Sequence, residues 1–231
     1  MLKNYIKRIT VCVFGLVLFG FGTYINIRAN IGLSPWSAFN MGISNITGML
    51  YGDISVVVSL VLIIVDMILG ENIGIGTILN SIIVGKTVDL FMYLDIIPEA
   101  GKFLHGLGIL VIGQLLLALG SYFYMSAELG CGPRDSLMLA SGRRVPKIPI
   151  GAVRGTIEAV VSIAGWLMGA KIGLGTLLSV ATIGICLQFV FRLFRYDPKS
   201  VKHENLIDTI KLIFRKEKTE RNDSKKEKDN N

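Results

Sequence analysis

Long apolar runs, separated by short glycine-rich or polar breaks, dominate the pattern of residues along the chain. Six runs contain few charged residues and cover about 9–27, 54–70, 74–94, 103–125, 152–169 and 173–195. A helix needs about 20 predominantly apolar residues to cross the hydrocarbon core of a bilayer. The pattern therefore predicts an all-α polytopic membrane protein, with a transmembrane domain over 1–195 that contacts the lipid bilayer.

Two blocks of sequence occur twice and in the same order. ANIGLSPWS at 29–37 is matched by AELGCGPRD at 127–135, and GENIGIGT at 70–77 is matched by GAKIGLGT at 169–176. A duplicated apolar unit interrupted by Gly and Pro at matching places is typical of transporter folds. We therefore expect two repeats, over about 9–95 and 103–195, each with three transmembrane helices and a short half-helix.

Each expected half-helix is marked by a proline. Ser34 precedes Pro35, and Gly132 precedes Pro133. Proline is favoured at the first helical position, where its missing N–H would have no partner in any case. Only about eight residues separate Pro133 from the Gly-Arg-Arg that follows, too few to cross a core of about 30 Å at about 1.5 Å per residue. Both elements are predicted to be half-helices or re-entrant segments.

A second pair of glycine-rich turns opens the last helix of each repeat. These turns contain Gly74, Gly76 and Thr77 in the first copy and Gly173, Gly175 and Thr176 in the second. Neither has the Lys-Ser/Thr or the preceding strand of a phosphate-binding loop. We interpret them as helix starts or close packing sites, with the two threonines bonding across helices.

The net charge of +7 is concentrated at the ends of the apolar runs. The basic residues concerned are Lys3, Lys7, Arg8, Arg143, Arg144, Lys147, Arg192, Arg195, Lys199 and Lys202. This distribution follows the positive-inside rule and argues against a nucleic-acid groove. It places both termini in the cytoplasm and favours repeats of inverted orientation.

The chain after the last apolar run has a different character. One apolar face of helical period over 196–217, with basic residues beside it, predicts an amphipathic helix on the cytoplasmic leaflet that contacts anionic lipid. The final stretch, 218–231, is polar and mixed in charge, and we expect it to be disordered.

The three cysteines and two histidines are scattered, so neither a disulfide, a metal site nor a cofactor is expected. No pairing of a nucleophile with a base is visible, which argues against an enzyme.

Ionisable residues inside apolar runs are costly, and they are therefore the candidates for solute or ion binding. Arg134 and Asp135 lie at the second half-helix start, where Arg134 and the positive helix end can hold an anionic group. In the alternative, Asp135 satisfies first-turn N–H groups and Arg134 pairs with a carboxylate or a lipid headgroup. Arg154 and Glu158 are spaced i, i+4, which favours an ion pair, with Glu158 as a proton-coupling carboxylate in the alternative. Lys86 and Asp89 are spaced i, i+3 and follow the same argument. Ser34 and Ser37 complete the candidates in the first half, while Asp66 is expected to be exposed at the cytoplasmic interface.

Together these motifs resemble the YczE branch of the YczE/YyaS/YitT family of bacterial integral membrane proteins. The resemblance rests on GPRD at 132–135, Arg154 with Glu158, and GxGT at 74–77 and 173–176. It implies a bacterial inner-membrane protein and carries over no substrate. The family pattern often has an acidic residue at the position of Ser37, so the two half-helices differ in chemistry here.

The favoured hypothesis is a small-molecule or ion transporter, or a subunit of one, with an asymmetric site in the charged second half. The alternative is a non-transporting membrane accessory that supports a partner protein or the production of a secreted metabolite. Either one is compatible with a homo-oligomer or a membrane partner.

Overall fold

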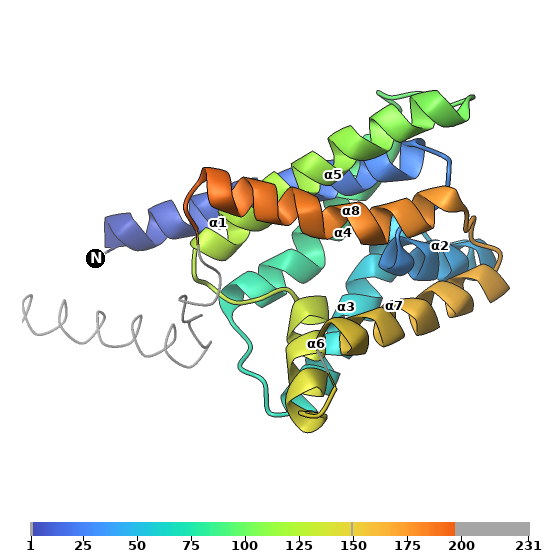
Figure 1. Cartoon of the computed structure of the whole chain (residues 1–231). Coiled ribbons are helices and arrows are strands. Elements are labelled where there is room, and N and C mark those ends of the chain that lie inside the picture. The colour runs from blue at the N-terminus through green and yellow to red at the C-terminus, as the bar shows by residue number, and fades with distance from the viewer. Residues whose placement is uncertain (1, 149, 197–231) are drawn as a thin grey trace, which may run out of the picture.

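The computed structural model describes residues 2–148 and 150–196, and within them every element of regular secondary structure is an α-helix (Figure 1). The eight helices are α1 Leu2–Arg28, α2 Pro35–Thr47, α3 Tyr51–Ile68, α4 Ile75–Leu94, α5 Phe103–Ser126, α6 Pro133–Arg144, α7 Ile150–Leu167 and α8 Leu174–Leu193. Beyond Tyr196, the expected amphipathic helix and the expected disordered tail lie outside the described residues.

Five helices of the described part are long and apolar enough to cross a membrane: α1, α3, α4, α5 and α8. They correspond to five of the six predicted runs. The sixth run forms α7, which has 18 residues and is not among the five. The chain is therefore an α-helical protein with at least five candidate membrane spans.

The two short helices begin at the two prolines. α2 has 13 residues from Pro35 and α6 has 12 residues from Pro133, each after a residue of extended backbone. At about 1.5 Å per residue these helices are about 18–20 Å long, short of a hydrocarbon core of about 30 Å. α2 packs against α7, and α6 packs against α3, so each short helix contacts a helix of the other half of the chain.

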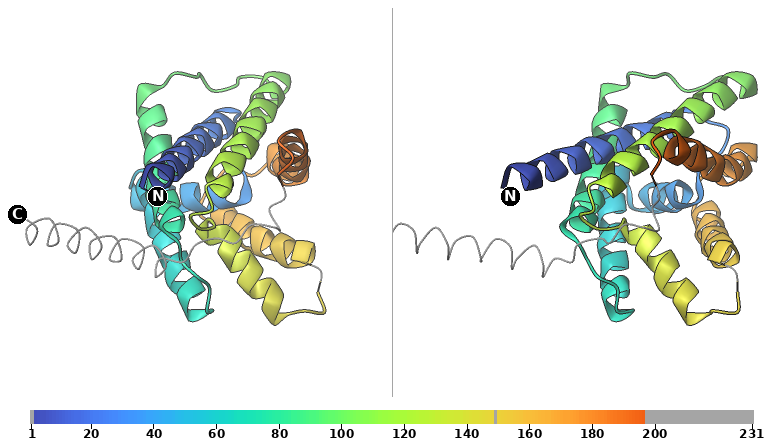
Figure 2. Two further views of the ribbon diagram at one scale, coloured as in Figure 1. Left: turned by 90° about the vertical axis from the view of Figure 1, so that its left-hand side faces the viewer. Right: turned by 60° about the vertical axis from the view of Figure 1, so that its left-hand side comes forward.

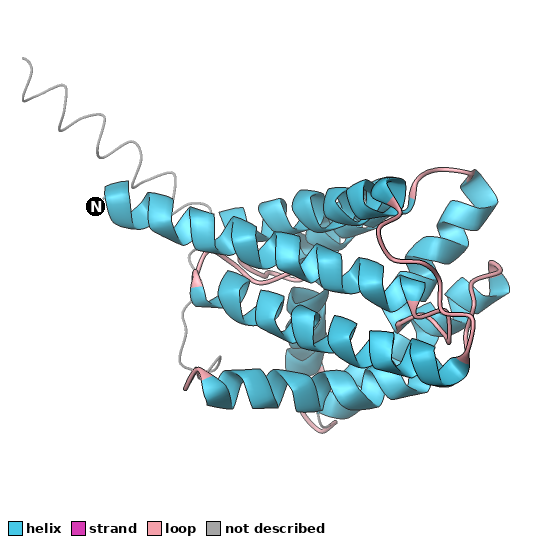
Figure 3. Ribbon diagram, turned by 90° about the horizontal axis from the view of Figure 1, so that it is seen from above, coloured by secondary structure: helices cyan, strands magenta, loops and turns pink. Residues whose placement is uncertain are grey.

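Glycines bring α1 and α5 into backbone contact along the centre of the molecule, where Figure 3 shows the long helices side by side. A Cβ atom on Gly15 would lie 2.8 Å from the carbonyl oxygen of Gly120, and one on Gly22 would lie 2.9 Å from that of Gly113. The order of the contacts shows that the two helices are antiparallel. Small residues allow such an approach, which supplies packing energy where the surrounding lipid is as apolar as the side chains.

Two backbone hydrogen bonds join the halves reciprocally. The N–H of Gly76 at the start of α4 donates to Leu129 O at 2.8 Å, and the N–H of Gly175 at the start of α8 donates to Ile31 O at 2.9 Å. The residue after each of these carbonyls is a glycine with positive φ: Gly32 at +129° and Gly130 at +130°. L-residues rarely adopt this backbone, so glycine is needed at both turns.

The threonines of these turns do not bond across helices, contrary to the prediction. Thr77 Oγ1 accepts a hydrogen bond from Gly74 N, and Thr176 Oγ1 accepts one from Gly173 N, each at 3.3 Å. Each hydroxyl thus satisfies an N–H at the start of its own helix, which is the lower-cost solution when a helix begins inside the protein.

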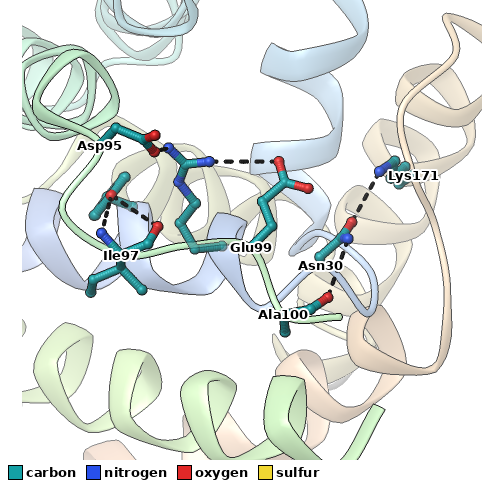
Figure 4. A network of polar contacts seen from close by, with 8 residues as sticks. Asn30, Asp95, Ile97, Glu99, Ala100 and Lys171 are labelled. Atoms are coloured by element: carbon teal, nitrogen blue, oxygen red, sulfur yellow. Dashed lines mark hydrogen bonds and ion pairs between the residues drawn. The ribbon is translucent and has the colours of Figure 1, made fainter. Parts of the chain in front are cut away.

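A polar network holds the loop between α4 and α5 against the end of α1 (Figure 4). Arg28 pairs with Asp95 and, at 3.6 Å, with Glu99, while Lys171 Nζ donates to Asn30 Oδ1 at 3.0 Å. Lys171 therefore lies at the same end of the molecule as this acidic loop. The network anchors the connection between the two halves of the chain.

Candidate functional site

A cavity of about 720 Å³ lies among the helices, and all eight of them contribute to its wall. Its size falls within the range of about 300–1,000 Å³ that is usual for small-molecule sites. Both short helices begin at this cavity, because Ser34, Pro35 and Trp36 line one part of it and Gly132, Pro133 and Arg134 line another. The unpaired N–H groups and the dipole of a helix N-terminus favour an anion.

Arg134 is the cation of the cavity that has no carboxylate partner. Its guanidinium carbon lies 5.1 Å from the centre of the Trp36 ring, a cation–π contact between the two short helices. Among the described residues, no Asp or Glu oxygen comes within ion-pair distance of it. A half-buried guanidinium without a carboxylate is a strong candidate for binding an anion in two-point geometry.

Asp135, the next residue of α6, is held by α5. The Tyr124 hydroxyl donates to Asp135 Oδ2 at 3.0 Å, and Tyr124 itself is buried. Because a hydroxyl supplies only part of what a carboxylate can accept, Asp135 retains acceptor capacity toward the cavity. Arg134 and Asp135 thus present opposite charges at one helix start without pairing with each other.

Arg154 and Glu158 form an ion pair within α7, with Nε to Oε1 at 2.8 Å. Both line the cavity. The Glu158 side chain is 13% exposed, while that of Arg154 is 40% exposed. The pair places a nearly buried carboxylate on the α7 wall, together with the cation that neutralises it.

Three other candidates lie outside the cavity. Lys86 pairs with Asp53, and Asp89 accepts from Gly52 N at 2.6 Å, so both hold α4 against α3. Ser37 is buried, accepting from Ser34 at 2.9 Å and from Tyr51 at 3.2 Å. The helix-start residues Gly74, Gly76, Thr77, Gly173, Gly175 and Thr176 do not line the cavity either.

Sequence reasoning missed several polar residues that line the cavity from the long helices: Ser59, Asn80, Gln114, Ser121 and Ser179. Gln114 is 2% exposed, and its Oε1 atom has no hydrogen-bond partner among the described residues. A buried amide oxygen without a partner costs free energy unless a ligand or water supplies one. A glutamine in the middle of an apolar run indicates a functional position, so Gln114 could have been identified from the sequence.

The expectation for Asp66 is wrong. This residue of α3 is 0% exposed, and neither carboxyl oxygen has a hydrogen-bond partner among the described residues. The burial is tertiary, since α3 packs against α2, α4 and α6, the last of which begins 67 residues after Asp66. Nearby, Arg143 of α6 pairs with Glu71, and Arg144 donates to Leu69 O at 3.2 Å.

In the part of the chain that the structure describes, no group of three or more His, Cys, Asp or Glu residues is placed to hold a metal ion. The chemistry of the cavity is therefore that of charges, amides and hydroxyls on an apolar wall.

Comparison with known proteins identifies relatives over most of the chain. An uncharacterized protein of Haemophilus influenzae is 31% identical over 192 residues, covering 83% of this chain and 87% of its own. The uncharacterized membrane protein YczE of Bacillus subtilis is 29% identical over 191 residues, covering 82% and 87%. The uncharacterized protein YyaS of the same species is 28% identical over 176 residues, covering 75% and 87%.

No solved structure matches the chain. The model of a family of unknown function, DUF6198, matches residues 6–192. Together with the YczE and YyaS relatives, this match confirms the resemblance seen in the motifs. The chain belongs to this YczE-like family, DUF6198, and is a membrane protein.

Proposed function

We propose that this protein is a transporter of a small anionic solute, or a subunit of one, built from two inverted repeats. The antiparallel contact of α1 and α5 supports the inverted arrangement. Gly15 corresponds to Gly113 in the repeat, and Gly22 corresponds to Gly120, with 98 residues between the members of each pair. In the fold, Gly15 lies against Gly120 and Gly22 lies against Gly113. Equivalent helices that cross a bilayer in opposite directions are what an inverted repeat requires.

The observation that carries the proposal is Arg134, a guanidinium without a carboxylate partner, at the start of a half-helix in a cavity walled by both halves. In known transporters, broken helices aim their N-termini at anionic groups near the midplane. Arg134 and the first turn of α6 bind the anion. Gln114 and Ser34 supply polar contacts around it.

Glu158 has a separate role. Its ion pair with Arg154 neutralises a carboxylate that would otherwise be costly in the cavity wall. An incoming anion competes for Arg154, and Glu158 then takes up a proton, which couples solute binding to a proton gradient. The protein lies in the bacterial inner membrane, with three spans in each repeat and both termini in the cytoplasm.

The test uses the full-length protein in liposomes, with uptake of a panel of small carboxylates and phosphates measured under a pH gradient. Arg134→Gln is expected to abolish uptake, Arg134→Lys to retain part of it, and Arg192→Gln, an exposed arginine of α8, to leave it unchanged. Labelling of Ser34→Cys from either side reports access to the cavity. If no anion moves, and labelling occurs from one side under every gradient, the proposal fails.

A further inference from the structure

The two halves of the chain differ in how closely their last two helices pack. In the first half, α3 and α4 are in backbone contact, because a Cβ on Gly52 would collide with Gly85 O. Lys86 also ties the two helices together through Asp53. Gly184 of α8 lies 99 residues after Gly85, yet a Cβ there would meet nothing within 4 Å. α7 and α8 run apart in both views of Figure 2, joined by the turn that precedes α8.

The cavity extends into this separation. Its wall includes Arg154, Ile157 and Glu158 from α7 and, facing them, Val180 and Ile183 from α8. Val180 is 41% exposed, although it belongs to a candidate membrane span. α7 and α8 both line the cavity and are not among the helix pairs that pack on each other, so the cavity lies along the separation between them.

The α8 side of this opening is apolar, whereas the α7 side carries the Arg154–Glu158 pair. α8 is the least covered of the five candidate spans, with 22% of its apolar window buried against 39–50% in the others. Leu177, Ile185 and Phe189 of α8 are 60–70% exposed. A face of this kind contacts acyl chains in a bilayer, so the opening leads into hydrocarbon and not into water.

The cavity itself is divided in polarity. Arg134, Asp135 and the α6 N-terminus form a polar end, whereas Ile183, Leu187 and Phe191 of α8 form an apolar wall. An occupant that satisfies both has an anionic head and an alkyl chain. A fully water-soluble anion would leave the apolar wall without a partner.

We infer that the separation of α7 and α8 is a lateral portal, through which an amphipathic anion enters from the bilayer. Its head binds Arg134 and the first turn of α6, and its chain lies between α7 and α8. This inference names the solute class for the proposed site, but the binding it describes does not require transport. Anionic phospholipid and a free alkyl carboxylate share this chemistry.

The two tryptophans of the chain allow a direct test. Trp36 lines the cavity, whereas Trp166 of α7 is 61% exposed. In Trp166→Phe protein, Trp36 is the sole tryptophan, and bromine atoms on a lipid chain quench its fluorescence only near contact. In Trp36→Phe protein, Trp166 reports ordinary lipid contact. Both are reconstituted in phosphatidylglycerol or phosphatidylcholine with brominated chains.

Brominated phosphatidylglycerol is expected to quench both tryptophans, and brominated phosphatidylcholine to quench Trp166 alone. Arg134→Gln removes a charge-assisted contact with the head and is expected to weaken quenching of Trp36 by about tenfold in apparent affinity. Gly184→Phe adds an aromatic ring to α8 where a Cβ atom meets nothing within 4 Å, and it is expected to narrow the separation from α7 and remove quenching of Trp36. Gly108→Phe, at another helical glycine with open space, is expected to leave it unchanged.

Quenching of Trp36 by bromoundecanoate in unbrominated liposomes, without quenching by brominated phosphatidylglycerol, would assign the free alkyl acid as the occupant within the same class. If Trp36 is quenched by neither, while Trp166 is quenched, the portal does not admit amphipathic anions and the inference is wrong. Equal quenching by the zwitterionic lipid would refute the anion assignment. Uptake of a water-soluble anion with Trp36 unquenched would leave the proposed function standing and the portal refuted.

Discussion

Asp66 offers the sharpest test of the packing, because the structure buries its carboxyl group without a partner. Neither oxygen has a hydrogen-bond partner in the part of the chain that the structure describes, and the residue is 0% exposed. A buried polar group in this condition costs about 1–3 kcal/mol. Asp66→Ala removes that cost and improves helix propensity by about 0.5 kcal/mol, but loses packing worth about 0.8 kcal/mol. The variant is expected to be more stable by about 1–2 kcal/mol.

The assay is thermal unfolding of the purified protein in detergent, followed by loss of the monodisperse peak in size-exclusion chromatography. Asp66→Asn is the matched control: it keeps the size and leaves an amide unpaired, so it is expected to stay near the wild type. A loss of more than about 1 kcal/mol in Asp66→Ala would refute the reasoning, since it would mean that the carboxyl group makes a stabilising contact. Such a result would indicate that an ion or a water molecule binds the carboxyl group of Asp66.

Three further predictions follow from single contacts. Gly120→Leu should destabilise the α1–α5 pair by more than about 3 kcal/mol, because a side chain there would collide with the backbone of α1. Gly108→Leu is the control, since its Cβ meets open space, and it should give the same monodisperse peak as the wild type. Tyr124→Phe should cost about 1–3 kcal/mol in thermal unfolding, because the half-buried Asp135 loses its donor; an unchanged midpoint would mean that the bond contributes nothing. Arg154→Gln should lower the free energy of unfolding by about 0.5–1 kcal/mol, because Glu158 loses its partner. Adding Glu158→Gln should restore part of that loss; strictly additive effects of the two substitutions would contradict the prediction.

Local features of the fold were accessible from the sequence. Pro35 and Pro133 start helices because proline suits the first turn, and Arg154 pairs with Glu158 because one helix brings i and i+4 together. Five long apolar runs became helices long enough to span a bilayer. Each of these outcomes depends on residues within a few turns of one another.

Features that depend on contacts between distant segments could not be predicted from the sequence. Asp66 is buried only once the helices are assembled, and the placement of Arg134 against Trp36 depends on bringing α6 to α2 from the other half of the chain. The sequence allows the hydroxyls of Thr77 and Thr176 to bond either to another helix or to the start of their own helix. Only the backbone geometry shows that they bond to the start of their own helix. The separation of α7 and α8 could not be predicted from the repeat, because Gly85 and Gly184 lie 99 residues apart at corresponding positions and yet have different neighbours in the fold.

The reciprocal hydrogen bonds at Leu129 and Ile31 also set an order of events during synthesis. The first turn of α4 lacks an acceptor for Gly76 N until residue 129 has been made, and Ile31 O lacks its donor until residue 175 has been made. Neither half can complete its backbone pairing alone, so the nascent first half must wait in the membrane with an unsatisfied helix start. A chain cut in the loop between α4 and α5 should therefore yield stable protein only when both fragments are made in the same cell.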